Sequence, residues 1–145
     1  MHPHFPISMK QHSTNYIQTL ITPAEDSTAV KGTVPPEKPD KKSIANYQFE
    51  WIGKHPLQYT SDDVLFEVHA IRKDILPEEK AQERQKFFAK GQPCLRTSPL
   101  AKTYGWGIYA DEEGKVKLVD MASDEYQAIL ANEAIKKVPA MKSKK

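Results

Sequence analysis

The chain has 145 residues, of which 39% are hydrophobic and 28% are charged, and its formal net charge is +2. This length and composition predict a single globular domain with one core, and they exclude a disordered chain. The balance of charge excludes a field strong enough to steer the whole protein to nucleic acid or to a membrane, so we expect neither partner.

Residues 1–13 are predicted to be a disordered extension of a single domain over 14–141, with a basic tail at 142–145. The first residues, MHPHFP, contain two prolines and none of the segments of a signal peptide. The sequence leaves open whether translation starts at Met1 or Met9. The lysine-rich end, KKVPAMKSKK, indicates a solvated tail. The alternative, a nucleic-acid-binding arm, lacks aromatic residues for stacking.

The first half of the domain is predicted to contain a strand and a helix joined by a long loop. Residues 14–22 are rich in β-branched and aromatic residues, which is typical of a strand. The prolines of residues 23–42 predict a loop, and its length makes it the first place to expect mobility. Residues 43–55 are predicted to form a central helix that is capped by Ser43 and apolar over more than half its circumference.

Residues 60–75 begin with a potential helix cap at Ser61 and continue with apolar residues at alternate positions, which we interpret as a strand. In that strand one face carries Phe66, Val68 and Ala70, and the other carries Leu65, Glu67, His69 and Ile71. Residues 76–91 predict a helix, because Pro77 suits its first position and Gly91 its end.

The last part of the domain is predicted to be a hairpin, a helix and an edge strand. Residues 106–121 predict the hairpin, and residues 123–134 a short helix capped by Ser123. Residues 134–141 predict a strand that Pro139 confines to an edge. The fold class is therefore α+β, an antiparallel or mixed sheet of four to five strands with two to three helices packed on one face.

Two nucleotide-binding motifs are excluded, and we expect no cofactor. Lysine and threonine at 102–103 resemble the end of a P-loop, but Arg96 and Ala101 occupy the positions of its glycines. The segment GWGIYA at 105–110 fits a dinucleotide fingerprint, yet it opens a strand and not a helix. No histidine pairs with another histidine or a cysteine at zinc-finger spacing, so we expect no metal site either.

One candidate site is catalytic and consists of His69, Glu67 and Cys94. In a strand Glu67 and His69 share a face, where the carboxylate would raise the pKa of the imidazole and fix its tautomer for general-base chemistry. The alternative is a polar pair on a solvated face. Arg96 lies two residues from Cys94 and would favour its thiolate, but a lone cysteine is also commonly a small core residue. The sequence leaves open whether Cys94 and His69 form a catalytic dyad.

The second candidate site is a ligand pocket in the stretch CLRTSPLAKTYGWGIY over 94–109. Its candidate binding residues are Arg96, Ser98, Lys102, Tyr104 and Trp106. The cations suit an anion, the hydroxyls and loop amides would complete the pocket, and the aromatic rings could stack on a ligand. We expect the loop over 31–42 to cover it, adding Lys38, Lys41 and Lys42. The alternative is a turn that leads into the hairpin, with the tryptophan in the core.

Four stretches together resemble a family of small bacterial proteins of unknown function. They are VPPEK at 34–38, VLFEVHA at 64–70, RTSPLAKTYGWGIYADEEGK at 96–115 and SDEY at 123–126. The resemblance runs from about Thr14 to the end of the chain. It implies a bacterial, stand-alone cytosolic domain, and it brings no reaction, cofactor or catalytic residue.

The sequence therefore favours a non-enzymatic domain that binds a small anionic ligand or a protein partner. The alternative is an enzyme of unknown reaction that uses His69 with Glu67 and Cys94. A third hypothesis is a homodimer in which the mate covers a strand edge or an aromatic face. A single cysteine and the lack of 18 consecutive apolar residues predict a cytoplasmic location with no membrane span.

Overall fold

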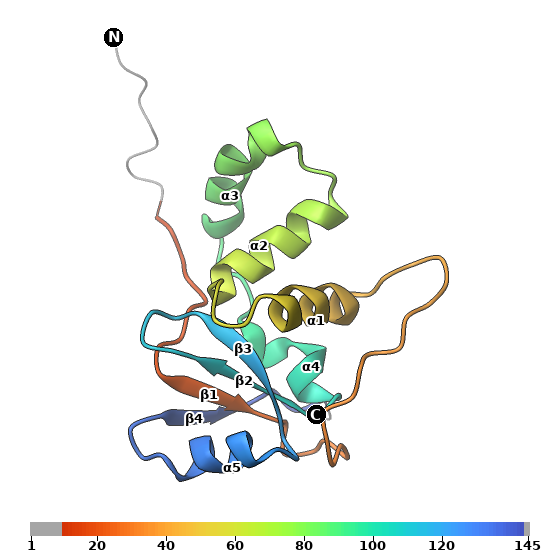
Figure 1. Cartoon of the computed structure of the whole chain (residues 1–145). Coiled ribbons are helices and arrows are strands. Elements are labelled where there is room, and N and C mark those ends of the chain that lie inside the picture. The colour runs from red at the N-terminus through yellow and green to blue at the C-terminus, as the bar shows by residue number, and fades with distance from the viewer. Residues whose placement is uncertain (1–9, 144–145) are drawn as a thin grey trace.

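The computed structural model describes residues 10–143 as a four-stranded sheet with helices on both faces (Figure 1). The strands are β1 (Thr19–Thr22), β2 (Trp106–Ala110), β3 (Val116–Asp120) and β4 (Lys136–Pro139), in the order β3-β2-β1-β4. The central strand β1 is antiparallel to β2 and parallel to β4, while β2 and β3 form the predicted hairpin. This mixed sheet confirms the α+β class and the edge position of the last strand.

Five helices surround the sheet in the described part of the chain, which is more than the two or three predicted. They are α1 (Ile44–Lys54), α2 (Ser61–Arg72), α3 (Lys80–Phe88), α4 (Pro99–Lys102) and α5 (Asp124–Ala131), with short 3₁₀ turns at Pro77–Glu79 and Leu95–Thr97. Helices α1 to α4 lie on one side of the sheet and α5 on the other (Figure 1), so the expected single helical face was wrong. No helix within residues 10–143 is long and apolar enough to cross a membrane.

The strand predicted within residues 60–75 was wrong, because this segment is helix α2. A capping box starts the helix: Asp63 N donates to Thr60 Oγ1 at 3.1 Å, and Thr60 N donates back to the Asp63 carboxylate at 3.0 Å. The apolar alternation has a helical cause. Residues two apart on a helix lie roughly 200° apart, so alternate positions mark two opposite faces.

Both of these opposite faces of α2 are buried. Val64 and Val68 belong to the main core, which contains residues of α1, α4 and the sheet. Phe66 and Ala70 belong to a separate apolar cluster with Phe88 of α3. A helix packed on two sides therefore produces the period of two that the sequence pattern attributes to a strand.

The segment that precedes the sheet is held against α2 and α3. Thr14 donates its backbone N–H and its hydroxyl to the Asp62 carboxylate, both at 2.7 Å, and Ser13 donates its hydroxyl to the same group at 2.8 Å. His12 N donates to Phe88 O at 2.8 Å. The predicted extension otherwise falls on residues 1–9, which lie outside the described residues.

The long loop over 23–42 is tied to the start of β2. Thr33 N donates to Tyr104 O at 2.9 Å, and the indole N–H of Trp106 donates to Thr33 O at 2.8 Å. Gly105 has φ +79°, and a Cβ there would stand 2.0 Å from the carbonyl oxygen of Lys31. The glycine therefore lets the loop backbone lie directly on the entry to the strand.

We expect Gly105→Ala to lower the free energy of unfolding by at least about 2 kcal/mol, because the side chain meets both a left-handed backbone and the loop. Gly53→Ala is the matched control, since a Cβ at Gly53 in α1 meets nothing within 4 Å. It should raise the free energy of unfolding by up to about 1 kcal/mol. Urea denaturation of both variants checks this, and equal midpoints would contradict it.

Candidate functional site

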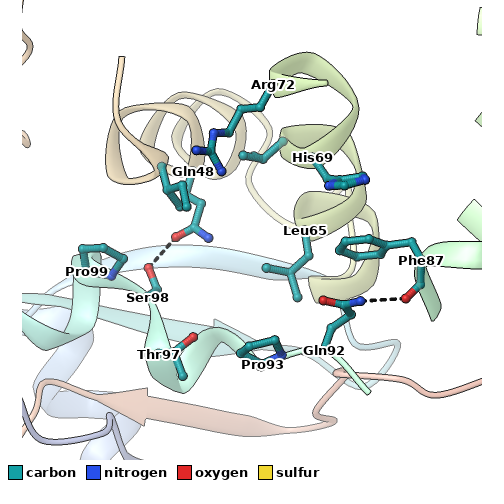
Figure 2. Close-up of a pocket in the computed structure, with 12 residues that line it drawn as sticks. Gln48, Leu65, His69, Arg72, Phe87, Gln92, Pro93, Thr97, Ser98 and Pro99 are labelled. Atoms are coloured by element: carbon teal, nitrogen blue, oxygen red, sulfur yellow. Dashed lines mark hydrogen bonds between the residues drawn. The ribbon is translucent and has the colours of Figure 1, made fainter. Parts of the chain in front are cut away.

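A groove of about 350 Å³ lies between helices α1 and α2, the end of α3 and the segment that leads into α4 (Figure 2). Its apolar lining consists of Ile44, Leu65, Val68, Phe87, Pro93 and Pro99. Its polar lining consists of Gln48, His69, Arg72, Gln92, Thr97 and Ser98. No acidic side chain is among these lining residues, so the groove combines an apolar surface with donors and one permanent cation.

Helix α2 supplies one wall of the groove through regular helical spacing. Leu65, His69 and Arg72 stand at i, i+4 and i+7, which places them along one face of the helix. This face lies between the two buried faces that hold α2 in position. The packing of the helix therefore fixes the direction in which these side chains point.

Gln48 of α1 and Ser98, the N-cap of α4, form a buried hydrogen bond beneath the groove. The Ser98 hydroxyl donates to Gln48 Oε1 at 2.6 Å and accepts from Leu100 N at 3.2 Å. Gln48 is only 4% exposed and Ser98 only 2%. Because the amide oxygen is occupied, the amide nitrogen of Gln48 points away from Ser98 toward Leu65 and the groove (Figure 2).

The amide nitrogen of Gln48 has no hydrogen-bond partner within residues 10–143. The nitrogen is open to the groove, where water can accept its hydrogen bond. The Ser98 bond fixes its direction, so an acceptor of a ligand in the groove would take the place of that water. Gln48 is therefore the most directional binding group of the groove.

His69 is neutral at neutral pH. Its ring packs on Phe87 with 4.5 Å between ring centroids. Burial lowers the pKa of the imidazole, the positive charges of Lys73 and Arg72 lower it further, and only Glu83 of α3 opposes them. Neither ring nitrogen is hydrogen-bonded within the described residues, so the side chain offers the groove one donor and one acceptor.

Arg72 stands at the rim of the groove, at the last position of α2. It forms no ion pair with a carboxylate of residues 10–143. Figure 2 shows its guanidinium turned toward Gln48 across the groove. The carbonyl end of α2 stabilises the cation without neutralising it, so Arg72 remains available to an anion.

The predicted catalytic residues are not assembled. Because α2 is a helix, Glu67 lies on the side opposite His69 and forms an ion pair with Lys80 at 2.9 Å. The expectation that Glu67 raises the pKa of His69 was therefore wrong, since that pKa is lowered. Cys94 does not line the groove, and its sulfur lies 3.5 Å from the hydroxyl of Tyr16.

Of the predicted ligand-binding residues, Ser98 lines the groove and the others lie elsewhere. Arg96 Nε donates to Pro139 O at 2.7 Å, which ties the segment to β4. Tyr104 and Trp106 hold the long loop through Thr33, and no residue of 31–42 lines the groove. A ligand-binding role for Arg96, Lys102, Tyr104 and Trp106 stays a prediction.

Sequence reasoning missed Gln48, Arg72 and Gln92. The signal in the sequence that could have identified Arg72 is the capping box at Thr60. This box predicts a helix, and a helix places Arg72 on the same face as His69. Nothing local brings Gln48 to Ser98, which is 50 residues further along the chain. No group of three or more His, Cys, Asp or Glu side chains in the described part of the chain could hold a metal ion.

Comparison with known proteins identifies a family for the chain, and the function of that family is unknown. A family model described as a family of unknown function, DUF6157, matches residues 11–145. This match confirms the resemblance to an uncharacterised family that the sequence motifs indicate. No curated protein and no solved structure matches the chain.

We expect His69 to make stability pH-dependent. Its folded-state pKa is below the value of about 6.5 in an unfolded chain, so the unfolded state binds more protons in the window just below pH 6.5. The contribution of neutral His69 to the free energy of unfolding is complete above about pH 6.5 and is lost as the pH falls toward the folded-state pKa. Wild type should therefore lose more free energy of unfolding between pH 7 and pH 5 than His69→Gln, as measured by urea denaturation.

The matched control for this measurement is His12→Gln, which removes an exposed imidazole that does not line the groove. If the two substitutions changed the pH dependence equally, His69 would have no special environment and the interpretation would be wrong.

Proposed function

The chain belongs to this family of unknown function, DUF6157, and we propose that its groove binds a small carboxylate with an apolar body. The observation that carries the proposal is the pair of unpartnered donors, the Gln48 amide and the Arg72 guanidinium, which face an apolar surface. A carboxylate supplies acceptors for both of them.

The charge of the lining favours an anion. Arg72 is a permanent cation, and the lining contains no carboxylate to neutralise it. A guanidinium binds a carboxylate through two parallel hydrogen bonds, which are stronger than bonds between neutral groups. The neutral donor of Gln48 adds direction, because the hydrogen bond from Ser98 to the amide oxygen fixes the orientation of the amide.

The remaining lining favours an apolar ligand body. Leu65 and Val68 come from α2, Phe87 from α3, and Pro93 and Pro99 from the segment opposite them. Burial of apolar ligand surface contributes about 25 cal/mol for each Å² removed from water. A groove of about 350 Å³ is at the small end of the volumes seen for small-molecule sites, so it suits a small molecule better than a folded partner.

The lining supports binding better than a reaction. Its two hydroxyl groups are already engaged, because Ser98 donates to Gln48 and Thr97 donates to the carbonyl of Cys94 at 2.7 Å. Neither hydroxyl has a basic side chain as its acceptor, which nucleophilic catalysis by a hydroxyl requires. The neutral imidazole of His69 is then a hydrogen-bonding group for the ligand.

We expect hexanoate, octanoate and phenylacetate to bind and to shift the amide NMR signals of groove residues, while the matched primary amides bind more weakly. Arg72→Gln should weaken carboxylate binding about tenfold, or about 1.4 kcal/mol, and leave amide binding unchanged. Lys73→Gln is the matched control, since it removes a cation one residue along that does not line the groove.

Gln48→Glu is a second test of the same groove. The variant keeps an acceptor for Ser98, replaces the free donor by a carboxylate oxygen and gives Arg72 a counter-ion. It should abolish carboxylate binding while the chain stays folded. The proposal would be contradicted if carboxylates and amides bound with equal affinity. It would also be contradicted if the Arg72 and Lys73 variants lost equal amounts of carboxylate affinity.

A further inference from the structure

A second hollow adjoins the groove on the far side of the ring pair formed by His69 and Phe87. It has a volume of about 380 Å³ and shares His69, Phe87 and Gln92 with the groove. Its other lining residues are Glu83, Lys86 and Lys90, from helix α3 and the residues just after it. The two hollows are therefore neighbours on one surface, separated only by side chains that line both.

The dividing side chains are held in place. The rings of His69 and Phe87 are 4.5 Å apart between centroids, with 34° between their planes. Gln92 Nε2 donates to the carbonyl oxygen of Phe87 at 2.7 Å, which fixes the side chain beside the ring pair. A ligand that crosses from one hollow to the other would therefore pass over an ordered ridge made of two aromatic rings and the Gln92 side chain.

The second hollow has a free cation of its own. Lys86 forms an ion pair with Glu83 at 3.3 Å, so these two charges offset each other. Lys90 forms no ion pair with any residue in the described part of the chain. Each hollow therefore contains one uncompensated cation, Arg72 in the groove and Lys90 beyond the ridge.

We infer that the ligand of this surface is a dicarboxylate with an apolar spacer. One carboxylate lies against Arg72 and Gln48, the spacer crosses the His69–Phe87 ridge, and the second carboxylate lies against Lys90. Charge complementarity at both ends and an apolar middle select this class over a monocarboxylate. The inference rests on the proposed function, because it extends the same groove by a second subsite.

The test is a length series of linear dicarboxylates, from glutarate to sebacate, against monocarboxylates of equal length, with the full chain at physiological ionic strength. Calorimetric titration should show an optimum length at which the dicarboxylate binds at least about tenfold tighter than its monocarboxylate partner. Lys90→Gln should remove this advantage and leave the monocarboxylate affinity unchanged. Lys54→Gln, an exposed lysine of α1 that lines neither hollow, is the control.

The outcomes separate the inference from the proposed function. If dicarboxylates bind no tighter than monocarboxylates at every length, the second subsite is refuted and the groove proposal stands. If Lys90→Gln weakens both classes equally, Lys90 acts only through its general field and the inference is overturned. If no carboxylate of either class binds, both proposals fail together.

Discussion

The packing of helix α2 on two opposite sides is the constraint on which the groove depends. Val64 and Val68 fix one side in the main core, and Phe66 and Ala70 fix the other against α3. A helix buried on one side only can rotate by a few degrees at little cost. A helix buried on two sides cannot rotate in this way. The face between the two buried sides, which carries His69, therefore points in a single direction.

The second constraint is the close approach of the long loop to the start of β2. The backbone of the loop lies where a side chain at residue 105 would stand, and Trp106 bonds to the loop through Thr33. Only two residues further along the loop, the carbonyl oxygens of Pro35 and Pro36 accept hydrogen bonds from Asn46. The aromatic and glycine residues that suggest a ligand pocket in the sequence thus have a structural role, and none of them lines the groove.

Sequence patterns correctly predict those parts of the fold that are determined by residues close together in the chain. The hairpin, the helix caps at Ser43 and Ser123, and the edge strand with Pro139 all follow from residues close together in the chain. The second helix was misread because two buried helical faces give the same period as one strand face. The site was missed for a different reason, since Gln48 and Ser98 meet only through tertiary packing.

The orientation of Gln48 bears on what the groove is for. Its amide oxygen accepts the Ser98 hydrogen bond, and its amide nitrogen is therefore held on the side of the groove, where it is open to water. The ligand-free fold thus presents a donor in a fixed direction. Arg72 adds a cation without a counter-ion to the same groove, although the chain forms ion pairs elsewhere, as between Lys80 and Glu67. A fixed donor and an exposed cation without a counter-ion, gathered in one hollow, are matched by an acceptor with negative charge, and that is the physical basis for regarding the groove as a binding site.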